Sequence, residues 1–86
     1  MVRRFSFKWY KNEKYREPME RINSITVVDA PEDTGLAAKT AVNLFEENFG
    51  SLRYNTIISI QEYNDEGFIG EPIVPDTENT ILPTKR

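Results

Sequence analysis

The apolar positions between residues 36 and 49 recur with the spacing of a helix that lies on a core. The positions that form this stripe are Ala38, Ala41, Val42, Phe45 and Phe49, widened by Ala37 and Leu44. Asp33 and Thr34 are candidate N-caps, because a short side-chain oxygen accepts from a free amide of the first turn. The alternative is an earlier start at Asp29, which has capping-box spacing to Glu32. Gly50 predicts the end of the helix after Phe49.

Strict alternation of apolar and polar residues predicts a strand over residues 4–10. Further strands are expected over residues 21–28 and over residues 54–63, where β-branched residues dominate. In the first strand one face carries Phe5, Phe7 and Trp9, and the other carries Arg4, Ser6, Lys8 and Tyr10. In the second strand Ile25 and Val27 face opposite to Thr26 and Val28. In the third strand one face carries Thr56, Ile58 and Ile60, and the other carries Ile57, Ser59, Gln61 and Tyr63.

A further short strand is expected over residues 68–74, after a turn at 64–67. Gly70 and Pro72 predict that it is an edge strand or a bulged one. The expected fold class is therefore α+β, with one helix packed on a three- to four-stranded, mainly antiparallel sheet. The simplest sheet order places the strands as 21–28, 4–10, 54–63 and 68–74. One domain spans residues 1–74, and residues 75–86 form a polar, proline-containing tail.

The composition is that of a globular domain, with 38% hydrophobic and 29% charged residues. No run approaches the ~20 apolar residues of a membrane span, and no apolar stretch follows the basic N-terminus as in a secretory signal. The chain contains neither histidine nor cysteine. Catalytic triads and His/Cys metal sites are thereby excluded. We expect no enzymatic activity, no cofactor and no membrane association, and we expect a cytoplasmic location.

Carboxylates are the remaining candidates for chemistry, and each has a simpler interpretation. Glu62 and Glu71 can oppose each other across the last hairpin, and a pair of carboxylates can do acid–base work. Two like charges on a solvated hairpin are the commoner case. Asp65 and Glu66 precede Gly67 in a turn that lacks the ligand spacing of a calcium loop.

The net charge of −3 conceals an asymmetry along the chain. Basic residues predominate in residues 1–22, and acidic residues predominate in residues 23–82. Such a division favours two surfaces with different partners, or two surfaces that complement each other within the molecule. We expect the uncovered face of the sheet to carry Arg4, Lys8 and Tyr10 beside Ile57 or Tyr63.

A protein partner is the interaction that these patterns favour most. An acidic surface can orient a basic partner, and exposed aromatic residues are enriched at interfaces. Pairing through the last strand would also permit a homo-oligomer. The candidate protein-binding residues are Glu46, Glu47, Tyr54, Tyr63, Phe68 and Ile69.

Nucleic acid is the alternative partner, bound through the basic and aromatic N-terminal strand. Cationic side chains neutralise phosphates, and exposed aromatic rings stack on bases. The residues that would carry this role are Arg3, Arg4, Lys8, Trp9, Tyr10 and Lys11. Against it, the alternation places Trp9 in the core with Phe5 and Phe7, and the acidic remainder of the chain repels phosphate. A purely structural or oligomer-forming role is a third hypothesis.

The succession of a strand hairpin, the segment VDAPEDTGLAAKTA and the strand ISIQEY resembles small bacteriophage-encoded accessory proteins. Some proteins of this kind inhibit host RNA polymerase and have a ββαβ arrangement. The resemblance covers residues 22–63 and carries over no functional residue. It implies a non-enzymatic accessory or anti-host factor that binds a host or phage macromolecule in the host cytoplasm.

Overall fold

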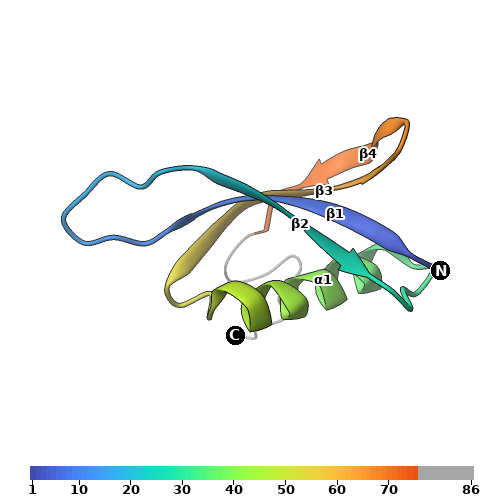
Figure 1. The fold of residues 1–86 in the computed structure, drawn as a ribbon, viewed down its shortest axis with the longest axis horizontal. Helices are drawn as coiled ribbons and strands as arrows, with labels where there is room; N and C mark the ends of the chain where they lie inside the picture. Colours follow the sequence, from blue (N-terminus) through green and yellow to red (C-terminus); the bar gives the residue numbers. More distant parts are fainter. Residues whose placement is uncertain (76–86) are drawn as a thin grey trace.

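The computed structural model describes residues 1–75 and is an α+β fold with one helix and one antiparallel four-stranded sheet (Figure 1). The elements in chain order are β1 (Arg3–Lys11), β2 (Arg21–Val27), α1 (Thr34–Phe49), β3 (Asn55–Asn64) and β4 (Gly67–Ile73). The sheet order is β2-β1-β3-β4, with every neighbouring pair antiparallel. Both the predicted fold class and the predicted strand order are confirmed. Apart from Pro75, the predicted tail lies outside the described residues.

Helix α1 begins at Thr34, because Asp33 caps it. The Asp33 carboxylate accepts a hydrogen bond from the Leu36 amide at 3.0 Å, so the earlier start at Asp29 is wrong. At the other end of the helix, Gly50 has a φ of 112°, a value that residues other than glycine rarely adopt. The Gly50 amide donates a hydrogen bond to the Glu46 carbonyl. Within residues 1–75 no helix is long and apolar enough to cross a membrane.

The core lies between α1 and one face of the sheet. Ala37, Ala38 and Ala41 are fully buried, and their small side chains let the first half of the helix approach the strands closely. In the second half Phe45 stacks on Phe7 at a centroid distance of 5.0 Å. Trp9 packs against the same Phe45 ring in a T-shaped arrangement, with a centroid distance of 5.0 Å and an interplanar angle of 85°. The predicted apolar stripe of the helix and the inward face of β1 are thus confirmed.

A β-bulge changes which residues of β3 face the core. Lys8 pairs with Ser59 while the next residue, Trp9, pairs with Ile57, so Ile58 is left without a partner on β1. The extra residue reverses the alternation. Ile57 and Ile60 are consequently both buried on the helix side. The prediction that Ile57 and Ile60 point to opposite faces is wrong. Of the two β3 residues expected on the uncovered face, Tyr63 lies there, opposite Arg4, and Ile57 does not.

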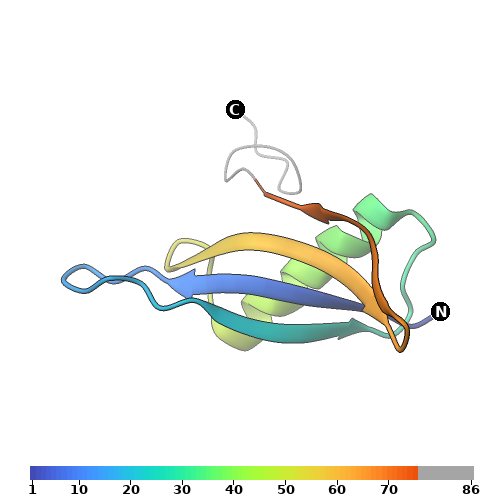
Figure 2. The same cartoon turned by 90° about the horizontal axis from the view of Figure 1, so that it is seen from above.

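Helix α1 packs mainly on β2 and β1, and the opposite face of the sheet has no covering layer among the described residues (Figures 1 and 2). Strand β4 forms one edge of the sheet and β2 forms the other. The register of β4 shifts between Ile60 and Glu62 of its neighbour, which confirms the predicted irregular edge strand. The connection between β1 and β2, residues 12–20, extends away from the body (Figure 2).

Candidate binding surface on the uncovered sheet face

Two cationic residues and no carboxylates occur among the central strand positions of the uncovered face. Residues directly opposite each other in an antiparallel pair share a face. The four outward residues of β1 are Arg4, Ser6, Lys8 and Tyr10, which confirms that Tyr10 lies on this face, where it is paired with Thr56 of β3. The first three lie at the centre of the face. Their partners on β2 and β3 are Thr26, Ser24, Ile22, Tyr63, Gln61 and Ser59. The charge division predicted from the sequence therefore appears, on this part of the sheet, as a face whose strands carry only positive charges.

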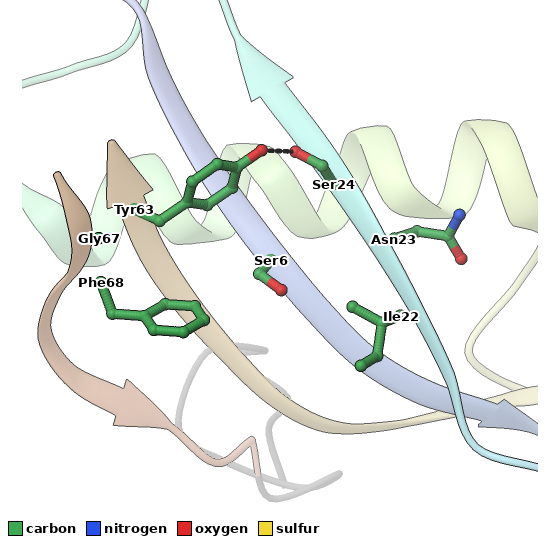
Figure 3. A pocket seen from close by; sticks show the side chains of 7 residues that line it. All are labelled: Ser6, Ile22, Asn23, Ser24, Tyr63, Gly67 and Phe68. Carbon is green, nitrogen blue, oxygen red and sulfur yellow. Dashed lines mark hydrogen bonds between the residues drawn. The ribbon is translucent and has the colours of Figure 1, made fainter. Parts of the chain in front are cut away.

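A groove of about 380 Å³ crosses this face from β2 to the β3–β4 hairpin (Figure 3). Ile22 forms one wall and Phe68 the other, and their exposed fractions are 64% and 68%. Ser6 of β1 lies between them and forms the floor. Two large apolar side chains are therefore left in water on either side of a small polar one, which makes a recess that a side chain of a partner can enter.

The end of the groove is closed by a hydrogen bond between the hydroxyl groups of Tyr63 and Ser24. These residues come from β3 and β2, which flank β1, so the tyrosine ring spans the central strand. The small side chain of Ser6 leaves room for the Tyr63 ring to lie across β1. On its other side Tyr63 pairs with Phe68 of β4. The bond fixes the tyrosine ring as a wall of the groove.

Both cations of this face are held at its margins by carboxylates from loops. Arg4 donates to Asp65 at 2.9 Å, and its guanidinium lies 5.2 Å from the centre of the Tyr63 ring. The hydrogen bond to Asp65 raises the pKa of Arg4 above its usual value. Lys8 lies 3.7 Å from Glu20. Because these pairs are solvated, with Asp65 93% exposed, an incoming carboxylate can replace the loop carboxylates at little cost.

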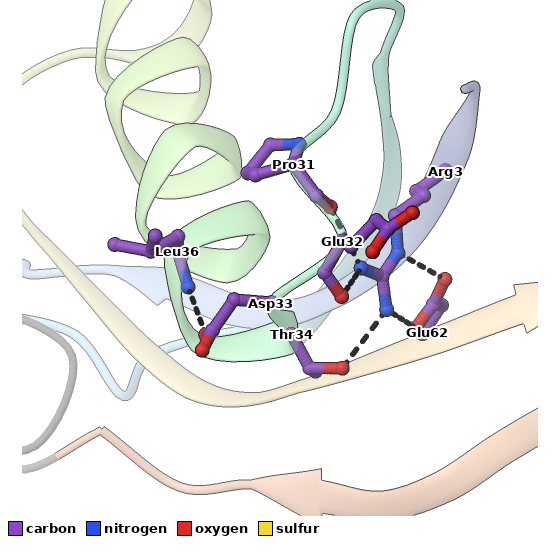
Figure 4. A network of polar contacts seen from close by, with 7 residues as sticks. All are labelled: Arg3, Pro31, Glu32, Asp33, Thr34, Leu36 and Glu62. Carbon is purple, nitrogen blue, oxygen red and sulfur yellow. Dashed lines mark hydrogen bonds and ion pairs between the residues drawn. The ribbon is translucent and has the colours of Figure 1, made fainter.

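Arg3 lies on the other face and holds the start of the helix against the sheet (Figure 4). Its guanidinium donates to both carboxylate oxygens of Glu62 at 2.8 Å, to the carbonyls of Pro31 and Glu32, and to the Thr34 hydroxyl. These bonds use all five donors of a guanidinium. The hydrogen bonds from Arg3 lower the pKa of Glu62, and the same bonds raise the pKa of Arg3. Glu62 is therefore held ionised, which is the wrong state for a general acid paired with Glu71.

The structure separates the residues proposed for nucleic-acid binding. Trp9 is 2% exposed and donates to the Asn23 side chain, so it offers no free ring face for a base. All five guanidinium donors of Arg3 are used in hydrogen bonds within the protein, so Arg3 has none left for a phosphate. Tyr10 is half-buried opposite Thr56. The residues of the set that lie on the exterior with their charge accessible are Arg4, Lys8 and Lys11.

The residues proposed for protein binding occupy three regions. Tyr63 and Phe68 are paired neighbours at the groove. Ile69 pairs with Glu62 and so lies on the helix side of the sheet. The remaining three are at the far end of α1 and in the turn after it. There Glu46 and Glu47 line a shallow hollow, and Tyr54 is 59% exposed.

Sequence reasoning missed Ile22 and the serines beside it. A signal was present, because Ile22 shares its strand face with Ser24 and Thr26 and is therefore an apolar residue on a polar face. No sequence signal indicated the role of Ser6, because Ser6 becomes the floor of the groove only when β2 and β4 lie on either side of β1 in the folded sheet. Arg3 was likewise grouped with Arg4, although the two point to opposite faces.

Comparisons with known proteins give no matching family model, no matching curated protein and no matching solved structure. Within residues 1–75 no three or more carboxylates gather closely enough to hold a metal ion.

Proposed function

We propose that this protein is a non-enzymatic module that binds another protein through the groove on its uncovered sheet face. The observation that carries the proposal is the pair of exposed apolar walls, Ile22 and Phe68, around a recess of about 380 Å³. Exposed apolar side chains that line a recess together with a few polar groups are typical of an interaction site. An aromatic residue beside a recess is also typical of the residues that dominate binding energy.

The charges around the groove define the kind of partner segment that fits. Arg4 lies beside Tyr63 at one end, and Lys8 is paired directly with Ile22 at the other. A segment with an apolar or aromatic anchor and a neighbouring carboxylate matches both features. The anchor fills the recess, and the carboxylate takes the place of the loop residue Asp65 or Glu20 on a cation. Association should therefore weaken at high salt without being abolished.

Several observations favour binding over catalysis. The chain has no histidine or cysteine. Both oxygens of Glu62 accept hydrogen bonds from Arg3, so this carboxylate is neither protonated nor free. The groove itself is lined by hydroxyl groups, an amide and apolar side chains, and none of these is an activated base or nucleophile.

Single-stranded nucleic acid fits the same face less well. Non-specific binding draws on several phosphate contacts, whereas the central strand positions of this face supply Arg4 and Lys8, each already paired with a carboxylate. The Tyr63 ring is covered by the Arg4 guanidinium on one face and tied to Ser24 at its hydroxyl, which leaves Phe68 as the freest platform for stacking. The resemblance to phage accessory proteins makes a host or phage protein the expected partner.

The proposal is tested by selecting binders from a library of random peptides on the immobilised protein. Selected peptides should share an apolar or aromatic anchor beside Asp or Glu, and they should bind the wild type in a calorimetric titration. Phe68→Ser should weaken binding by at least about tenfold, equivalent to ~1.4 kcal/mol. Val74→Ser is the matched control, because Val74 is 66% exposed and does not line the groove.

The same titration with single-stranded DNA and RNA distinguishes the alternative. Tight, strongly salt-dependent nucleic-acid binding that is lost in Arg4→Ala would overturn the proposal. So would selected peptides whose binding is unaffected by Phe68→Ser. Fluorescence of Trp9, the single tryptophan, reports whether each variant keeps its core.

A further inference from the structure

The two edges of the sheet differ in their capacity to accept another strand. Edge strand β4 contains Gly70 with a φ of 69°, Pro72 without an amide hydrogen, and a register shift. These are the features by which natural edge strands resist pairing with a further strand. These features therefore disfavour a homo-oligomer contact through this last strand, which the sequence pattern permitted.

Edge strand β2 has none of these protections. Residues 21–27 contain neither glycine nor proline, and their register with β1 is unbroken from Arg21 to Val27. Within residues 1–75, β2 pairs with β1 alone, and Figure 2 shows it as the outer strand of the sheet. Half of its backbone N–H and C=O groups therefore point away from the sheet and are available to a further strand.

The chain continues beside the sheet after β2 ends. The Ala30 amide donates to the Met1 carbonyl at 2.8 Å, which holds Ala30 beside the residues that precede β1, and residues 28 and 29 form a bend between β2 and this contact. Val28 in this segment is 63% exposed, close to the 64% of Ile22 near the other end of the strand. The edge thus carries an exposed apolar residue near each end, with Arg21 beyond one and Asp29 beyond the other.

We propose that β2 is a homodimer edge, to which β2 of a second copy of this chain adds in antiparallel orientation about a twofold axis at Ile25. In this register Ile22 lies opposite Val28 of the second copy, and Arg21 lies opposite Asp29 of the second copy. The interface is isologous, so each of these pairs occurs twice. Exposed apolar residues meet each other, and each terminal cation meets a carboxylate.

The neighbouring register, centred on Ser24, is less complementary. It places Ile22 opposite Thr26 of the second copy and Arg21 opposite Val27 of the second copy. An apolar residue then meets a polar one, and the cation has no direct partner. The register at Ile25 is thus selected by side-chain pairing on the same face, which sets the stability of antiparallel ladders. The dimer has one continuous sheet, with both helices on one side and both grooves on the other.

Light scattering and sedimentation over a range of protein concentrations test the proposal, with a dimer as the expected species at high concentration. Arg21→Asp and Asp29→Arg should each raise the dimer dissociation constant by at least about tenfold, because each puts like charges opposite each other. The double variant restores opposite charges and should return the constant toward that of the wild type. Arg53→Asp and Glu47→Arg are matched controls, since these exposed residues lie away from β2.

The absence of native cysteine allows the register to be tested directly. Residues opposite each other in an antiparallel pair lie within the Cα separation of a disulfide. A mixture of Ser24→Cys and Thr26→Cys chains should form a heterodisulfide under mild oxidation, whereas Ser24→Cys alone should not. A monomer at all concentrations, a disulfide from Ser24→Cys alone, or charge variants that behave like their controls would each overturn the proposal. Groove binding is measured separately through Phe68, so failure of either proposal leaves the other standing.

Discussion

Replacing Arg3 with methionine should destabilise the fold far more than the loss of an exposed ion pair would. The substitution removes five hydrogen bonds and leaves the Glu62 carboxylate without a cation in a site where the two side chains are only 11% and 13% exposed. It also frees the carbonyls that fix the loop before α1. The substitution therefore weakens both the contact between β1 and β3 and the packing of α1 on the sheet.

The magnitude follows from the burial of the pair. Removing one partner of a buried ion pair costs about 3–5 kcal/mol, and an exposed pair contributes about 0–1 kcal/mol. The Arg3–Glu62 pair keeps some contact with water, so we expect a loss near the lower end of the buried range, about 3 kcal/mol. For a domain of this size such a loss lowers Tm by roughly 12–24 °C.

Urea unfolding followed by Trp9 fluorescence measures the loss. Arg53→Met is the control, because Arg53 is exposed and its side chain makes no hydrogen bond or ion pair among the described residues. The double variant Arg3→Met with Glu62→Met should be more stable than Arg3→Met alone, since the unpaired charge is gone. If the unfolding free energy of Arg3→Met stays within about 0.5 kcal/mol of that of its control, the Arg3 network does not hold the helix against the sheet.

The pH dependence gives a second, independent readout of the same pair. Arg3 lowers the pKa of Glu62 in the folded protein below the value of about 4.3 expected in the unfolded chain. The resulting stability is present above that unfolded value and is lost as the pH falls through the folded pKa. The difference in unfolding free energy between wild type and Arg3→Met should therefore be largest near neutral pH and should narrow in acid. A constant difference across this range would contradict an ionic origin.

Three further substitutions, together with one control variant, test other parts of the fold by the same urea assay. Phe45→Ala should lower the free energy of unfolding by about 3–5 kcal/mol, because the ring is fully buried among aromatic neighbours. Tyr15→Ala is its control: Tyr15 is 90% exposed, so the substitution should change stability by less than about 0.5 kcal/mol. Asp33→Ala should cost about 1 kcal/mol through loss of the bond to the Leu36 amide; no change would mean that another residue caps α1. Gly50→Ala should cost about 1–3 kcal/mol, since alanine is strained at a φ of 112°, and a neutral result would mean that this turn relaxes.

The helix and the first strand were predictable because their patterns are long and regular. The stripe from Ala38 to Phe49 matches a helical period over three turns, and Phe5, Phe7 and Trp9 alternate without a break. The strand at 54–63 was found, but the direction of its side chains was not. One extra residue at Ile58 changes the face of everything on one side of it, and the pairing that creates the bulge involves β1, more than 45 residues earlier in the chain.

The candidate site was less predictable than the fold. Tyr63 and Phe68 were correctly grouped, because a short hairpin brings them together whatever the rest of the chain does. Ile69, one residue further, was placed with them but lies on the opposite face. Ile22 and Ser6 were missed because their neighbours in the groove come from strands that are distant in sequence.

The sequence by itself determined the type and order of the elements, the inward face of β1 and α1, and the exclusion of histidine and cysteine chemistry. These depend on side-chain periodicity and composition, which are properties of neighbouring residues. Only the tertiary structure decided that Arg3 ties the helix to β3 while Arg4 faces outward, and that Ile22 and Phe68 enclose a groove. Those relations depend on strand register, because a shift of one residue between strands moves every side chain to the other face.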